Sequence, residues 1–291
     1  MGWMQRLFGG TDDAAPPPPP VAAEVAPVPA VADDDQDEAD ALLRQHAKRA
    51  IVLRPRRADS PLPVRASKFG GMPNLAGLDA WPVCPNCAEP LVFVLQLYAA
   101  DFPAAWFPAD TDFCRVFRCV AADCDGAGPQ YDAVTLLSFL HVGDAEPVEP
   151  DAESFAADAD DDVRECALAP IAIDELPLDD APPELRAELL TTVPPSEWDA
   201  LVAMWSPDGS SKLGGFPGWI QGGCVPVCTC GAEMGFFLQL ASQEIDPEGE
   251  FSEAPGTWSS HGLMLGDVGT LYFFVCPECS PTAVQSVFEC S

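Results

Sequence analysis

Short apolar runs rich in β-branched and aromatic residues recur along the chain, separated by polar stretches that contain glycine and proline. Runs of this length and composition predict β-strands. The clearest of them are AIVLR (50–54), LVFVLQL (91–97), FCRVFRC (113–119), MGFFLQL (234–240) and TLYFFVC (270–276).

A helical period occurs in few places. From Asp35 to Lys48, apolar residues share one face, with acidic residues first and basic residues last, which favours a helix. Two shorter helices are predicted at Glu184–Leu190 and Ser196–Trp205. The pattern therefore predicts an α+β fold that is mainly antiparallel β.

Two segments of low complexity divide the chain. Residues 1–34 contain a polyproline run and an acidic end, which predicts a disordered tail. Residues 144–184 carry 15 acidic residues and one basic residue, Arg164, and we interpret this stretch as an acidic linker. These assignments leave residues 35–143 and 185–291 as two folded halves.

The two halves repeat one another. Three patterns recur in the same order: SKxGGxP at 67–73 and 211–217, FxLQL at 93–97 and 236–240, and FxC at 117–119 and 274–276. The growing offset between copies is accommodated by a polar insertion at 244–262. The chain is thus a tandem duplication of a β unit. We expect the two copies to pack as a pseudo-twofold pair, because each is too small to bury its apolar face alone.

Eight of the 12 cysteines fall into close pairs, two pairs in each half. Four thiolates on two turns suit a tetrahedral structural zinc ion, so the sequence predicts two zinc ions. The expected ligands are Cys84, Cys87, Cys119 and Cys124 in the first half, and Cys228, Cys230, Cys276 and Cys279 in the second.

The second set departs from the usual spacing. Only one residue separates Cys228 from Cys230, so Cys224 is an alternative ligand to Cys228. We expect structural or incidental roles for the other three unpaired cysteines, which are Cys114, Cys166 and Cys290.

The formal net charge of −32 excludes binding to nucleic acid or to anionic membranes and favours a basic partner. The acidity of residues 185–291, where only Arg186 and Lys212 are basic, predicts an acidic outer surface. The N-terminus lacks the apolar run of a signal peptide, and no apolar segment approaches the ~18 residues needed to span a membrane. We therefore expect a cytoplasmic protein.

Candidate catalytic residues are scarce, and we expect no enzymatic activity. The three histidines, His46, His141 and His261, belong to no recognisable catalytic motif. A zinc hydrolase is disfavoured because four thiolates close the metal shell.

Polar residues inside the repeated motifs have two readings. Lys68 and Lys212 either contact an anion or, as we favour, cap carbonyls or pair with an acid. Gln96 and Gln239 lie within apolar strands, and we expect a hydrogen-bond network shared across the pseudo-twofold axis rather than a ligand site.

The stretches SKFGGMP, WPVCPNCAEPLVFVLQLYA and GDVGTLYFFVCPECS resemble the bacterial YwqG-like family of unknown function. They are also similar to the eukaryotic programmed cell death protein 2 family. The resemblance covers residues 50–143 and 205–291, and the zinc finger that some eukaryotic members carry between the halves is missing.

The resemblance implies a duplicated β-rich fold. For the eukaryotic relatives it also implies a dedicated chaperone of a basic ribosomal protein, whereas some bacterial relatives lie near toxin–immunity genes. We therefore expect a zinc-stabilised, chaperone-like binding protein for a basic polypeptide, with an immunity protein against a basic toxin as the alternative.

Overall fold

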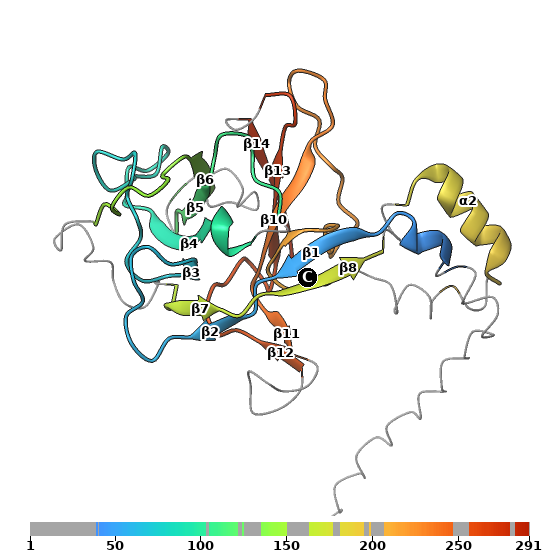
Figure 1. Ribbon diagram of the computed structural model, residues 1–291, viewed down its shortest axis with the longest axis horizontal. Helices are drawn as coiled ribbons and strands as arrows, with labels where there is room; N and C mark the ends of the chain where they lie inside the picture. The colour runs from blue at the N-terminus through green and yellow to red at the C-terminus, as the bar shows by residue number, and fades with distance from the viewer. Residues whose placement is uncertain are drawn as a thin grey trace, which may run out of the picture.

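In the residues that it describes, a computed structural model shows two six-stranded antiparallel sheets, one two-stranded hairpin and few helices (Figure 1). The predicted fold class is confirmed. The structure describes residues 39, 41–102, 105–121, 124, 135–149, 163–176, 181–194, 198, 207–246, 256–279 and 283–290.

Each repeat forms the larger part of one sheet. The first sheet has the order β2 (Pro55–Arg57), β7 (Cys166–Leu168), β3 (Lys68–Phe69), β4 (Val92–Tyr98), β5 (Phe113–Arg118) and β6 (Thr135–Leu140). The second has the order β8 (Ile171–Glu175), β1 (Lys48–Val52), β9 (Lys212–Gly214), β10 (Gly235–Ala241), β13 (Thr270–Val275) and β14 (Val284–Glu289).

The duplication extends to local irregularities of the backbone. The pairing of β4 with β5 shifts register between Phe93 and Leu95, and the pairing of β10 with β13 shifts between Phe236 and Leu238. A bulge re-aims the side chains that follow it, so both copies present the same face of the FxLQL strand to the interior.

The repeats exchange strands. β1 comes before the first SKxGGxP motif but pairs with β9 of the second motif, while β7 comes before the second SKxGGxP motif but pairs with β3 of the first. The segments 48–57 and 166–175 run antiparallel to each other, pairing as β1 with β8 and as β2 with β7. We call these two segments the ribbon; it passes from one sheet to the other (Figure 1).

Residues 163–176 lie within the stretch predicted as an acidic linker, yet they form β7 and β8. The reason is a short apolar sequence, CALAPIAI, between the acidic clusters at each end. The last two residues of the predicted linker, Pro183 and Glu184, begin the helix α2 (Pro183–Thr192). For 150–162 and 177–180, which lie outside the described residues, the predicted linker stays a prediction.

The main core lies between the two sheets. Side chains of both repeats contribute to it, and Phe237 of β10 receives the rings of Phe107 and Phe139 edge-on at centroid distances of 5.5 and 4.9 Å. Each sheet thus removes the apolar face of the other sheet from water, which stabilises the pair.

The predicted helix at Glu184–Leu190 is confirmed as α2 (Pro183–Thr192), with proline at its start. It packs through Leu185 and Leu189 against Leu43 of the short helical stretch 41–44, beside the sheets (Figure 1).

The remaining elements are short. They are the 3₁₀ turn η1 (Ala99–Asp101) and the hairpin of β11 (Glu244–Asp246) and β12 (Gly256–Trp258), which lies in the predicted insertion. The predicted tail at 1–34 and, apart from Trp198, the predicted helix at 196–205 lie outside the described residues. None of the helices in the described part of the chain is long and apolar enough to cross a membrane.

Candidate metal centres

The first cysteine set lies where two turns meet. Cys84 and Cys87 stand on a hairpin closed by an isolated bridge between Val83 and Pro90, and Cys119 directly follows β5. Sulfur atoms from the two turns approach closely, with Cys84 and Cys124 3.7 Å apart and Cys87 and Cys119 also 3.7 Å apart.

The second set is built in the same way. Cys228 and Cys230 stand on a hairpin with a bridge between Val227 and Glu233, and Cys276 follows β13. The Cys230 and Cys276 sulfurs lie 3.6 Å apart, and the backbone N–H of Cys279 donates to the Cys276 sulfur at 3.3 Å.

Each set has the dimensions of a tetrahedral metal site. Within each group of four, all sulfurs lie within 4.8 Å of one another. A metal–sulfur distance of ~2.3 Å gives a tetrahedral edge of about 3.8 Å, close to the observed separations. The cysteines are free thiols rather than disulfides. In the part of the chain that the structure describes, these are the two groups of His, Cys, Asp or Glu that could hold a metal ion.

The turns favour thiolate at the equivalent first cysteine of each set. Burial raises the pKa of Cys84, but the backbone N–H groups of Cys87 and Asn86 outweigh it and lower the pKa to about 7. The N–H of Cys230 likewise lowers the pKa of Cys228 to about 7. The pKa is raised at other cysteines of the same sets, namely Cys87, Cys119, Cys230 and Cys279. A thiolate is the form that binds metal, so each set favours one thiolate ligand before a cation binds.

The other cysteines lie apart from these sets. Burial raises the pKa of the Cys114 and Cys166 thiols, as expected of structural cysteines. Cys224 is exposed, and its sulfur contacts the carbonyl of Val225. The group of four includes Cys228 and not Cys224, so the alternative ligand does not approach the set.

The repeated SKxGG motif forms a buried ion-pair clamp in each sheet. Lys212 Nζ donates to Glu175 Oε1 at 2.5 Å, and Lys68 Nζ donates to Glu165 Oε1 at 2.9 Å. Both lysine side chains are fully buried. The preferred reading of the lysines, pairing with an acid, is therefore confirmed.

The second glycine of each motif makes room for that carboxylate. A Cβ at Gly215 would lie 2.2 Å from Glu175 Oε2, and one at Gly71 would lie 2.1 Å from Glu165 Oε1. Both glycines also have positive φ, which other residues adopt only with strain. The motif thus marks where Glu175, at the end of the ribbon, and Glu165, directly before the ribbon, pack against the two repeats.

The expected glutamine network across the pseudo-twofold axis is wrong. Gln96 Oε1 accepts from the N–H of Asn74, and its Nε2 donates to Val64 and Ala66 carbonyls, all in the first repeat. Gln239 bonds in the same way within its own repeat. Each glutamine satisfies the loop beside its own strand, because those loops are nearer than the other sheet.

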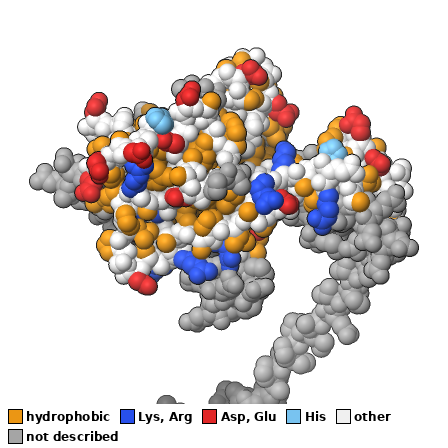
Figure 2. All heavy atoms as spheres, viewed as in Figure 1, with side chains coloured by type: hydrophobic (Ala, Val, Ile, Leu, Met, Phe, Trp, Pro, Cys, Tyr) orange, Lys and Arg blue, Asp and Glu red, His pale blue; other side chains and the backbone are white. Residues whose placement is uncertain are grey.

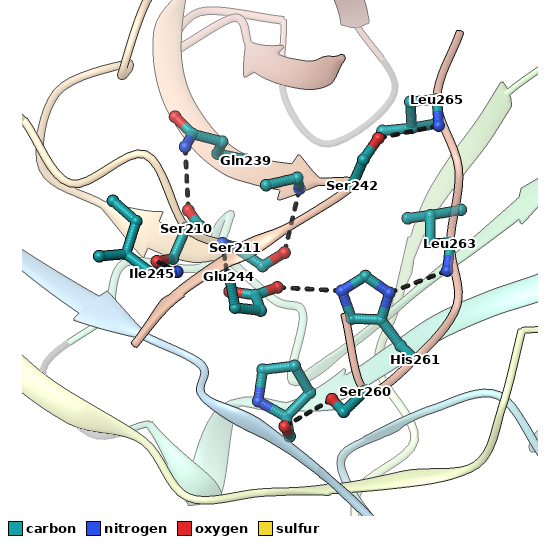
Figure 3. Close-up of polar contacts among 12 residues, drawn as sticks. Ser210, Ser211, Gln239, Ser242, Glu244, Ile245, Ser260, His261, Leu263 and Leu265 are labelled. Carbon is teal, nitrogen blue, oxygen red and sulfur yellow. Dashed lines mark hydrogen bonds and ion pairs between the residues drawn. The ribbon is translucent and has the colours of Figure 1, made fainter. Parts of the chain in front are cut away.

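Sequence reasoning missed a buried polar cluster at the boundary between the repeats (Figure 3). His261 Nε2 donates to Glu244 Oε1 at 3.0 Å, and His261 Nδ1 accepts the N–H of Leu263 at 3.0 Å. The other Glu244 oxygen accepts the N–H of Ser211. The imidazole stacks on Phe69 of the first repeat, with 4.7 Å between ring centroids.

This cluster is a structural element. His261 is completely buried, and both its nitrogens are engaged. The insertion at 244–262 begins at Glu244 and nearly ends at His261. The position of these two residues at its ends was the sequence feature that could have indicated their pairing.

Charge is unevenly placed. Twenty-five of the 46 acidic residues but only one of the 14 basic residues lie outside the described parts of the chain. In the face shown in Figure 2, Lys and Arg side chains gather along the ribbon. Several acids of the second half, such as Glu244 and Glu289, are buried and accept backbone N–H groups. The predicted acidic surface therefore cannot include these carboxylates.

Comparison with known proteins gives a limited result. No protein-family model matches the chain. A stretch of 80 residues is 37% identical to part of the uncharacterized protein YpfL of Salmonella typhimurium. The match covers 27% of this chain and 15% of that protein, so the chain spans only a small part of its relative's length. This is consistent with a bacterial family of unknown function.

Proposed function

We propose that the protein is a non-enzymatic, zinc-stabilised binding protein for a basic polypeptide. The observation that carries the metal part is the donor set: each centre offers four cysteine sulfurs at tetrahedral spacing. Thiolate ligands favour zinc, and four of them leave no position open for water or substrate. A structural role for each metal follows.

The partner is inferred from charge. The acidic excess is concentrated on segments outside the described fold, including 150–162 and 247–253. Acidic segments of this kind attract a chain rich in lysine and arginine and speed its association. The resemblance to the programmed cell death protein 2 family supports a chaperone-like role toward such a client, which in those relatives is a ribosomal protein.

Affinity purification from the native host, followed by mass spectrometry, tests this proposal. We expect basic proteins among the partners, with an association rate that falls steeply as salt is added, because charges are screened over ~8 Å at physiological salt. Changing Glu248, Glu250 and Glu253 to lysine should slow association more than it speeds release. Neutral or acidic partners, or binding indifferent to salt, would contradict the proposal.

The alternative is an immunity protein that neutralises a basic toxin. It requires the same charge complementarity but a single dedicated partner. A toxin gene next to that of this protein, and loss of toxicity on co-expression, would favour it over the chaperone-like role.

A further inference from the structure

The two cysteine sets differ in their access to solvent. In the first set, Cys84, Cys119 and Cys124 are buried and Cys87 is half-buried. In the second set, Cys230 is exposed and Cys279 is at least partly exposed. Among the described residues, only the second set therefore has two cysteines that are accessible to solvent.

The surroundings of the sets explain this difference. The first set lies under an apolar cover that includes Leu75, Leu91 and Trp81, whose indole N–H donates to the carbonyl of Leu91 at 2.7 Å. Cys228 and Cys276 lie in a corresponding apolar cluster with Met234 and Phe274. Beside Cys230, however, no atom lies within 4 Å of where a Cβ at Gly231 would stand. The shorter Cys228–Cys230 hairpin leaves its metal-binding turn open on one side.

We infer that the second cysteine set is a thiol-reactive metal site at which hydrogen peroxide links Cys230 to Cys279 and releases the metal, while the first set keeps its own. This inference rests on the proposed function, because it takes both sets to hold zinc. The two sulfurs lie within 4.8 Å of each other, so a small movement of either turn brings them to bonding distance.

The chemistry balances without a further reagent. The Cys230 thiolate attacks one oxygen of hydrogen peroxide, the O–O bond breaks, and hydroxide leaves, giving a sulfenic acid. The Cys279 thiolate then attacks that sulfur, a disulfide bond forms, and a second hydroxide leaves. Peroxide gains the two electrons that the two thiolates lose. The metal, left with Cys228 and Cys276, dissociates.

The same reaction is disfavoured at the first set. Cys87 is its one partly accessible thiol, and its three possible partners are buried. Because oxidation requires access of peroxide to the sulfur, the four sulfurs of the first set should stay reduced under conditions that oxidise the second.

The test uses the full-length, zinc-loaded chain and hydrogen peroxide. A zinc-sensitive dye follows release, and differential alkylation with peptide mass spectrometry assigns the oxidised cysteines. We expect one of the two zinc ions to leave at least about tenfold faster than the other, with Cys230 linked to Cys279 and the first set still alkylated as free thiols. Cys224→Ser is the matched control, since Cys224 is exposed but lies outside the set, and it should leave the fast phase unchanged.

Equal release of both zinc ions, first oxidation within the first set, or loss of the fast phase in Cys224→Ser would overturn the inference and leave the proposed function standing. A purified chain that binds no zinc before peroxide is added would overturn both.

Discussion

Lys212 is fully buried in the second sheet and donates to Glu175, which comes from the last position of β8 in the ribbon. Glu175 Oε1 also accepts the N–H of Asp208, and its other oxygen accepts the N–H of Phe216. One carboxylate thus neutralises a buried cation and satisfies two backbone donors that flank the SKxGG motif. Ten residues earlier, Glu165 pairs with Lys68 of the first sheet.

Replacing Glu175 with alanine should destabilise the protein by about 3–5 kcal/mol, because it leaves a buried ammonium without a counter-charge. Chemical denaturation followed by circular dichroism measures this loss. Asp174→Ala is the matched control: the Asp174–Arg49 pair is half-exposed, so its removal should cost at most about 1 kcal/mol. Glu165→Ala should fall between them, since Glu165 is 19% exposed and Lys68 also donates to the Leu62 and Pro63 carbonyls. Equal losses for Glu175→Ala and Asp174→Ala would refute the clamp.

Gly215→Ala should cost at least about 3 kcal/mol, because the new methyl group displaces the Glu175 carboxylate from the buried ammonium. Gly222→Ala separates this effect from backbone strain. Gly222 has a φ of +75°, close to the +73° of Gly215, but no atom lies within 4 Å of its missing Cβ. The Gly222 variant should therefore lose only the ~1–2 kcal/mol expected of a left-handed residue. Thermal melts of both variants, side by side, give the comparison.

Elemental analysis of the purified chain should find two zinc ions. Cys87→Ser and Cys230→Ser should each lower the metal content by one and lower the melting temperature, because metal-binding free energy contributes to folding. A strong chelator should lower the melting temperature of the unaltered chain for the same reason. Full metal content in either serine variant would show that its set is wrongly assigned.

A protease site inserted between residues 154 and 155 should give two fragments that stay together. Each sheet contains a strand from the other fragment, β1 beside β9 and β7 beside β3, so the fragments are held by strand pairing as well as by the core. Size-exclusion chromatography after cleavage should show one peak at the original volume. Two separate peaks, each containing one folded fragment, would contradict the strand exchange.

Local chemistry made much of this architecture predictable. The apolar runs located β4, β5, β10 and β13 to within a residue or two, and the spacing of the cysteines identified both groups of four. These strands and cysteine groups can be predicted from the sequence because their residues lie close together along the chain or recur at a similar offset in the two repeats.

Partner choice over long separations was not predictable. Lys212 pairs with an acid 37 residues away and Lys68 with one 97 residues away, in a chain that offers 46 acids. Nothing local marks Glu165 or Glu175 as different from the others. The exchange of strands was hidden for a similar reason, since the pairing partners of β1 and β7 depend on how two entire sheets pack.

The crossing of the ribbon from sheet to sheet has a consequence for the history of the gene. Two separate copies of a single ancestral unit could make every pairing seen here if each copy placed its N-terminal strand in the sheet of the other copy, as in a strand-swapped dimer. Joining such copies head to tail would need only a connector of sufficient reach, and its sequence would be free to drift. The intact molecule then corresponds to a swapped dimer whose two subunits are covalently joined. A chain shortened to one repeat would have one strand without a sheet to join, and its sheet would lack one strand.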